Sequence, residues 1–416
     1  MPSQPPLRRI STGRPLPLVL ALLGVTALHA PTRARADAGD AAEPPPTVSA
    51  SPGSGLLVRS ADGRHSLNIK TRMQVRDTVT VDRDARETTN EALLKTLRLY
   101  FQGNVLDADI KYTIQLALGA KDFESGNASP IFDAWVEFTH LRDARLRVGQ
   151  YFVPFDRART TREFALQFVD RQLPVRELTL DRDLGVMVYS QDLFGLDGAL
   201  AYNVFVGGGE GRNHAVAEAS GPMIVARLSY RPFGAFDDDQ EADLERRPSP
   251  RLAVGAGFAY NPQSSRAQST FGATFRRARF NYAQAAADVV FKYAGLSLLA
   301  EAVVRSADRD FAEFVDTDGT TVREWSREAW GYFAQLGYMF TRHTEVVGRW
   351  EQLRTFGAAT DPTLESLIAS TGDQAGGGLN VYLNGHAFKF QTDYFYAFGE
   401  SGRGRHTARI QLDATF

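Results

Sequence analysis

Alternating apolar and polar residues are the main pattern of this chain from residue 66 to its end. In Ser66–Val75, Leu, Ile, Thr, Met and Val occupy every second position, and Ser, Asn, Lys, Arg and Gln lie between them. Because side chains of an extended strand point alternately to its two faces, this segment is predicted to be a β-strand with one polar face. The same alternation recurs in Thr96–Val105, Ile110–Leu118, Leu252–Tyr260, Leu296–Val304, Trp330–Phe340, Phe388–Tyr396 and Ala408–Phe416.

The connections between these segments alternate in length. Short turns are predicted at 106–108, 141–143, 192–197, 293–295, 341–343 and 384–386. Longer polar loops are predicted near 82–92, 119–129, 152–182, 208–220, 261–279, 306–327, 354–374 and 398–404. Pro232–Pro250 is longer than the other connections on the short side. The pattern gives about sixteen strands, with short turns on one rim and long loops on the other, as in membrane-spanning β-barrels.

A soluble β-sandwich or propeller would show the same alternation, so the barrel needs further support. The segments are longer than the roughly five or six residues of an average strand. The chain ends in an aromatic residue, Phe416, after a last apolar strand face. A barrel must close its last strand on its first, because lipid cannot satisfy an open strand edge. We therefore expect an all-β, transmembrane antiparallel β-barrel with short periplasmic turns and long extracellular loops.

The N-terminus has the features of a secretory signal peptide. Three arginines precede the apolar stretch Pro15–Ala30, and Ala34–Ala36 has the small-x-small form of a cleavage site. A membrane anchor is the alternative, but the apolar stretch is short of the about 20 residues that a spanning helix needs. We predict a signal peptide over residues 1–36, a flexible periplasmic linker over 37–60 and the barrel over 61–416.

Composition and motifs limit the function classes. The chain has no cysteine, which excludes thiolate chemistry, and its formal net charge of -2 gives no basic signal for nucleic acid. The seven histidines are isolated, with no HExxH metal motif, and no GxSxG nucleophile motif is present. Asp316–Gly319 lacks the later ligands of a calcium loop and is interpreted as a turn. We predict no enzyme, no catalytic residue, no metal and no cofactor, with a barrel hydrolase as the least favoured alternative.

The polar strand faces are expected to line the lumen, because a charged side chain on the lipid face costs about 2–4 kcal/mol near the bilayer midplane. In the first five strands this phase places many basic residues inside, against only Asp133 and Glu137. The predicted pore-lining residues are Lys70, Arg72, Arg76, Arg98, Lys111, Arg145 and Arg147. Such a lining favours anions, and the planar guanidinium suits phosphate. The alternative is that these arginines pair with acids and stiffen the wall.

The longest polar connection, Phe152–Arg182, is predicted to fold into the barrel as a constriction. Its candidate constriction residues are Arg157, Arg159 and Arg162. Acidic residues are interleaved with the arginines of this loop, so salt bridges within it compete with an open row of anion-binding arginines.

Several motifs resemble the phosphate-selective porins O and P. They are Leu146–Phe155 (LRVGQYFVPF), Arg171–Pro174 (RQLP), Asp181–Met187 (DRDLGVM) and an early hairpin with Leu97–Gly103 and Asp109–Tyr112. The resemblance implies a sixteen-stranded barrel, usually a homotrimer, with an inward third loop and passage of phosphate or other anions along basic residues. This chain departs from the family where many members carry a Lys after the strand-end aromatic, because Phe152 and Val153 stand there.

The sequence therefore predicts a porin of a Gram-negative-type outer membrane. Passive diffusion of small anions, phosphate or related ones, is the first hypothesis. A general or sugar-type porin without anion selectivity is the alternative. The expected partners are small anions, outer-membrane lipid and further copies of the chain in a homotrimer, and no nucleic acid.

Overall fold

The computed structural model describes residues 45–119, 121–123, 129–214, 221–356, 371–398 and 404–416. The predicted signal peptide, residues 1–36, lies outside these ranges, as do parts of the predicted loops near 119–129, 208–220, 354–374 and 398–404. No helix within the described ranges is long and apolar enough to cross a membrane.

Antiparallel strands make up most of the described chain. They are β1 Thr47–Ser51, β2 Gly55–Arg59, β3 Ser66–Asp82, β4 Glu87–Val105, β5 Asp107–Ala117, β6 Ile131–Phe138, β7 Arg145–Phe152, β8 Arg182–Ser190, β9 Leu200–Gly207, β10 Met223–Tyr230, β11 Arg251–Ser264, β12 Phe280–Tyr293, β13 Leu296–Ala307, β14 Phe311–Val315, β15 Thr321–Trp325, β16 Ala329–Met339, β17 Thr344–Thr355, β18 Gly372–Asn384, β19 Phe388–Ala397 and β20 Arg405–Thr415. The short helices are α1 Arg157–Thr160, η1 Glu163–Ala165, α2 Leu173–Leu178 and η2 Leu193–Gly195.

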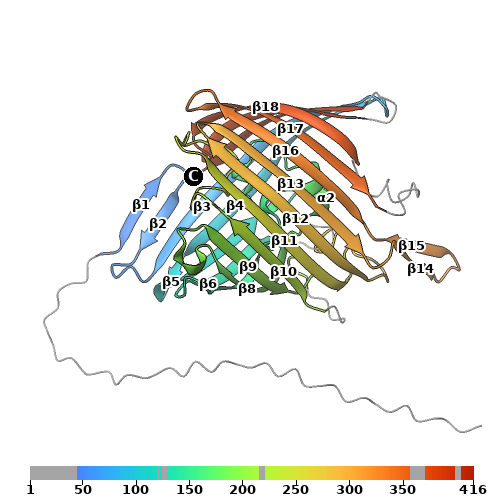
Figure 1. Cartoon of the computed structure of the whole chain (residues 1–416), viewed down its shortest axis with the longest axis horizontal. Coiled ribbons are helices and arrows are strands. Elements are labelled where there is room, and N and C mark those ends of the chain that lie inside the picture. Colours follow the sequence, from blue (N-terminus) through green and yellow to red (C-terminus); the bar gives the residue numbers. More distant parts are fainter. Residues whose placement is uncertain (1–44, 120, 124–128, 215–220, 357–370, 399–403) are drawn as a thin grey trace, which may run out of the picture. The chain divides into compact units, whose positions relative to one another are not determined.

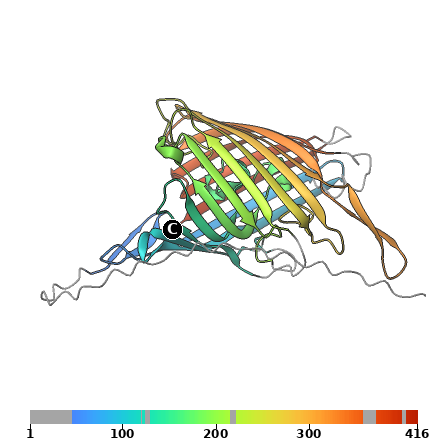
Figure 2. The same ribbon diagram turned by 60° about the horizontal axis from the view of Figure 1, so that its bottom comes forward.

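Sixteen of the described strands, β3 to β13 and β16 to β20, form a closed barrel. Each pairs with the next along the chain, except that β13 pairs with β16, because β14 and β15 form a separate hairpin. The barrel closes between β20 and β3, whose register runs from Arg405–Asp82 to Thr415–Arg72. Figures 1 and 2 show the strands wrapping obliquely around the barrel axis. The predicted sixteen-stranded antiparallel barrel is confirmed.

For residues 47–59, an N-terminal hairpin corrects the prediction that residues 37–60 are a flexible linker. β1 and β2 pair with each other, and β2 pairs with β3 from Leu56–Ile69 to Arg59–Ser66. The reason is the length of β3. At the end of β20, Phe416 exchanges backbone hydrogen bonds of 2.9 and 2.7 Å with Thr71, and the rest of the β3 edge is left to β2. Backbone N–H and C=O groups on an unpaired strand edge have no partner strand, and β2 provides one.

The predicted loop near 82–92 is also wrong. β3 and β4 continue through it and stay in register as far as Asp82–Glu87, so only residues 83–86 turn. The polar composition of this stretch suggests a loop, but its threonines and valines are β-branched and favour extended strands.

The apolar face of the strands points outward. On β16, Tyr332, Leu336 and Tyr338 are exposed, whereas Phe333 and Gln335 on the opposite face are buried. Large apolar side chains are exposed in the same way on the other strands, and these include Val136, Val148, Val186, Val204, Ile224, Phe258, Val346, Phe390 and Ile410. A sheet that exposes its apolar side chains outward around a closed barrel is suited to a hydrocarbon environment.

Two connections fold into the barrel. The inward loop, residues 153–181 between β7 and β8, is mostly buried, and its helix α2 packs on β13, β16 and β17. Figure 1 shows α2 inside the ring of strands. The short-side loop, residues 231–250 between β10 and β11, contacts the inward loop through Arg157–Asp238 and through Glu241, whose N–H bonds to the carbonyl of Ala165.

Candidate functional site

Wall carboxylates bind the backbone at the start of the inward loop. Glu301 on β13 accepts hydrogen bonds of 3.0 Å from the N–H groups of Arg157 and Ala158. Asp156 caps α1 by accepting a 2.6 Å hydrogen bond from the N–H of Arg159. The first N–H groups of a helix have no partner within the helix, so these two carboxylates satisfy them.

The remainder of the loop is held in the same way by β17 and β19. Glu351 accepts a 2.6 Å hydrogen bond from the N–H of Leu173, at the start of α2. Asp393 accepts one of 2.9 Å from the N–H of Val169. Glu301, Glu351 and Asp393 are therefore occupied by the loop, which lies against β11 to β13 and β16 to β19.

Inward-facing glycines make room for this contact. A Cβ added at Gly257 on β11 would lie 2.1 Å from the carbonyl oxygen of Phe155, and one at Gly331 on β16 would lie 2.8 Å from Pro174. Neither distance is possible for real atoms, so the loop sits where it does because these positions lack a side chain.

The short-side loop supports the inward loop from the other side. Arg157 forms ion pairs with Asp238, at 2.7 Å, and with Asp288 of β12. Glu241 accepts hydrogen bonds from the N–H of Gln167, at 2.7 Å, and from Gln172, at 3.1 Å. The predicted constriction residue Arg157 is thus a buried structural cation, and its guanidinium does not face open space.

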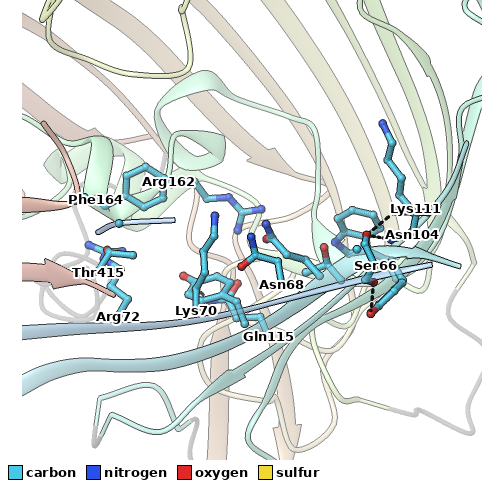
Figure 3. Close-up of a pocket in the computed structure, with 18 of the residues that line it drawn as sticks. Ser66, Asn68, Lys70, Arg72, Asn104, Lys111, Gln115, Arg162, Phe164 and Thr415 are labelled. Atoms are coloured by element: carbon cyan, nitrogen blue, oxygen red, sulfur yellow. Dashed lines mark hydrogen bonds between the residues drawn. The ribbon is translucent and has the colours of Figure 1, made fainter. Parts of the chain in front are cut away.

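Open space remains beside the first strands. A cavity of about 590 Å³ lies between β3 to β6 and the inward loop. The charged side chains among its described lining residues are Lys70, Arg72, Lys111 and Arg162, and none of the described lining residues is acidic. Figure 3 shows Lys70 on β3 and Arg162 on the inward loop pointing toward one another. The cavity therefore presents positive charge to any solute that enters it.

The four basic residues of the cavity differ in how far their charge is compensated. Arg72 is buried and bound to Asp413 at 2.6 Å. Arg162 is 40% exposed, and its ion pair with Asp133 is 3.2 Å long. Lys70 and Lys111 form no ion pair or hydrogen bond through their ammonium groups with any described residue. These two lysines and Arg162 are the groups best placed to meet an anion.

The other predicted wall residues lie outside the cavity lining. Arg76 donates to Gln411 at 3.0 Å and to the carbonyl of Val169 at 2.6 Å, so it holds the inward loop. Arg98 pairs with Asp122 at 2.9 Å and with Glu163 at 3.2 Å.

Arg145 and Arg147 on β7 are not among the described lining residues of the cavity either. Arg147 donates to Glu137 at 2.8 Å and lies 4.2 Å from the centroid of the Trp135 ring. Arg145 is half-buried and lies opposite Tyr189 in the sheet. The last constriction residue, Arg159, pairs with Asp181 at 2.7 Å. Of the ten predicted basic residues, Lys70, Arg72, Lys111 and Arg162 are brought together.

Arg182 is a residue that the sequence analysis did not single out. Its guanidinium lies 3.5 Å from the centroid of the Phe132 ring and 3.7 Å from that of Phe152, and it donates to Asp133 at 2.6 Å. An arginine between two rings is held in a defined position by cation–π attraction. Because Asp133 is shared between Arg182 and Arg162, its single negative charge is divided between two cations. The Arg-Asp-Leu-Gly motif beginning at Arg182 carried the only sequence signal for this position.

Electrostatics hold Asp170 and Asp181 of the inward loop ionised. Burial raises the pKa of Asp170, but the charges of Arg76, Arg176 and Arg409 outweigh burial and leave its pKa well below the ordinary value. Burial likewise raises the pKa of Asp181, and its arginine neighbours lower that pKa further than burial raises it. Asp170 and Asp181 therefore keep their ion pairs at neutral pH.

Three possible metal ligands meet at the short-turn rim, although the histidines are predicted to be isolated. Asp107, Asp109 and His140 have ligand atoms within 4.8 Å of one another, and His140 lies 3.6 Å from Asp107. His140 and Asp107 are each about half exposed and are not among the described lining residues of the cavity, so we assign them no role in it.

The fold and the site together define a porin-type barrel: a closed sixteen-stranded sheet that exposes apolar side chains and holds an inward loop beside a basic cavity. No protein-family model matches the sequence, and no curated protein matches it either. Several solved structures share the fold. The anion-selective porin from Comamonas acidovorans is similar with a TM-score of 0.54 and 11% identity, over 84% of this chain and 99% of that one.

Two further structures show the same likeness. Salmonella typhi OmpF, in complex with daunomycin, has a TM-score of 0.56 and 12% identity, over 85% of this chain and 98% of that one. The outer membrane channel DcaP of Acinetobacter baumannii has a TM-score of 0.50 and 11% identity, over 84% and 97%. At these identities the likeness shows a shared porin barrel fold.

Proposed function

We propose that this chain is an outer-membrane channel for the passive diffusion of small anions, phosphate or related ones among them. The observation that carries the proposal is the cavity with four basic side chains and no acid among its described lining residues. The sign of fixed charge along a narrow passage sets the sign of the ions that enter it.

The position of the inward loop supports this proposal. The loop occupies the acids of the later strands, so that the first strands, with Lys70 and Lys111, border the space that remains. Membrane location is supported by the exposed apolar strand faces and by the outer membrane channel DcaP, which shares the fold.

A general porin without anion selectivity is the second candidate, and ion pairing favours it. Arg72, Arg98, Arg147, Arg157 and Arg159 all pair with acids, so their charges are largely compensated. In this alternative the arginines stiffen the wall, and the two uncompensated lysines have no influence on ion choice.

The reversal potential of single channels in a planar bilayer separates the two candidates. The mature chain is measured under a KCl gradient near 0.1 M, where the Debye length is about 10 Å and wall charges are felt. A channel that favours anions gives a reversal potential with the sign of the chloride equilibrium potential. A potential near zero favours the general porin, and one of the sign set by potassium contradicts the proposal.

The homotrimer implied by the sequence resemblance stays a prediction. The described chain closes its own barrel, so each copy would hold a complete cavity. The mass of the detergent-solubilised protein in an analytical ultracentrifuge tests the prediction.

A further inference from the structure

The basic cavity is larger than a small inorganic ion requires. Its volume of about 590 Å³ falls within the roughly 300–1,000 Å³ of sites that hold small organic molecules. The other side chains that line the cavity therefore help to decide which anions it accepts.

Four aromatic rings line the same cavity as the uncompensated lysines. Tyr100 comes from β4, Tyr112 from β5, Trp135 from β6 and Phe164 from the inward loop, and all four are half-buried. A hydrated inorganic anion gains little from a ring face, whereas a planar organic ring gains both burial and favourable ring–ring geometry.

Neighbouring groups hold these rings in position. The Tyr100 hydroxyl accepts a 3.2 Å hydrogen bond from Gln115. The Arg72 guanidinium lies 5.3 Å from the centroid of the Phe164 ring, and Arg72 is itself fixed by Asp413. Rings that are already fixed lose little conformational freedom when a ligand binds against them.

The wall and the inward loop each supply both a cation and a ring surface to the space. Lys70 lies on the wall and Arg162 on the inward loop, and Figure 3 shows their charged ends converging with Phe164 nearby on the loop. A carboxylate between the two cations would leave the rest of its molecule within a cavity bordered by aromatic side chains.

We propose that the cavity is a subsite for organic anions in which a carboxylate is attached to a planar ring, such as aromatic carboxylates. The carboxylate lies between Lys70 and Arg162, and the ring lies against Phe164 and Tyr100. This inference rests on the proposed anion channel and adds the class of solute to it.

The test compares two carboxylates that differ in their ring. Single-channel chloride current is titrated with benzoate or acetate, in the unmodified mature chain and in Phe164→Leu. A ring contact of ordinary strength makes benzoate block at a concentration about two- to tenfold lower than acetate. Phe164→Leu abolishes most of that difference. Phe258→Leu, on the exposed apolar face, is the matched control and keeps the difference.

Tyr100→Leu provides a second variant in case Phe164→Leu fails to form channels, and it is expected to act in the same direction. Equal block by benzoate and acetate in an anion-selective channel would overturn the ring subsite and leave the proposed function intact. A benzoate preference that survives in both cavity variants would also overturn it. A cation-selective unmodified channel would remove the proposed function itself.

Discussion

Arg157 and Asp238 form an ion pair of 2.7 Å inside the barrel, although one belongs to the inward loop and the other to a connection on the opposite, short-turn rim. Both side chains are 8% exposed. The pair holds the inward loop from the side of the short-turn rim. Glu301 and Glu351 hold it from the barrel wall. The loop is therefore a rigid part of the barrel interior, and its position decides which side of the lumen stays open.

Breaking that pair is expected to loosen the inward loop. In Asp238→Ala, Arg157 keeps only Asp288 as an acidic partner. Removing one partner of a buried ion pair costs about 3–5 kcal/mol. We expect a lower free energy of unfolding in urea and a noisier single-channel current. Glu313→Ala removes an acid from an exposed pair on the β14–β15 hairpin and should change neither quantity. A quiet, fully stable Asp238→Ala channel would show that the loop does not depend on this pair.

The glycine at position 257 is expected to set how closely the inward loop approaches β11. A Cβ there would lie 2.1 Å from the carbonyl oxygen of Phe155, so Gly257→Ala must displace the loop backbone. Overpacking of this kind typically costs about 1–3 kcal/mol. We expect reduced stability and an altered single-channel conductance. Gly348→Ala, where an added Cβ meets nothing within 4 Å, is the matched control. Identical behaviour of the two variants would contradict the described contact.

Acidification is expected to release the loop. Burial raises the pKa of Asp238, but Arg157 and Arg231 outweigh it, so the folded pKa lies below the ordinary 3.8. Stabilisation by a lowered pKa is fully present above pH 3.8 and is lost as the pH falls below that value toward the folded pKa. Channel noise should therefore rise only below about pH 4. Noise that begins near pH 6 would point to other groups.

The N-terminal hairpin is expected to stabilise the barrel seam. Deleting residues 47–59 from the mature chain exposes the β3 edge at Ser66–Ile69, and each lost backbone hydrogen bond contributes about 0.5–1.5 kcal/mol. We expect a lower thermal transition of the detergent-solubilised barrel, measured as the temperature at which it loses its compact form on a gel. Unchanged thermal stability would mean that β2 adds nothing to the seam.

The barrel could be predicted from the sequence because alternation along a strand is a local property. The end of β3 at Asp82 and the start of β4 at Glu87 were harder to predict, because the polar side chains there are compatible with both a loop and a water-facing strand. The hairpin at 47–59 could not be predicted, because its reason is the length mismatch between β3 and β20, which only the closed sheet reveals.

The cavity was only partly predictable. Strand phase predicts that Lys70 and Lys111 face the interior, and both are among the lining residues of the cavity. Which arginines are neutralised depends on partners far away in sequence, such as Asp413 for Arg72 and Asp288 for Arg157. A single sequence does not show these pairings, and so it could not separate structural cations from those that border open space.

Charge reversal at the two uncompensated lysines tests directly whether the charge of the cavity sets the ion preference of the channel. Reversal potentials under a KCl gradient are compared for the unmodified chain, for Lys70→Glu/Lys111→Glu and for Lys121→Glu, which changes an exposed lysine outside the cavity. One unit charge at 4 Å in water changes the local energy of an ion by about 1 kcal/mol, or about fivefold in its concentration. The account predicts an anion-selective unmodified channel, a shift of at least that size toward potassium in the double variant and no shift in Lys121→Glu. Equal potentials in all three would contradict it.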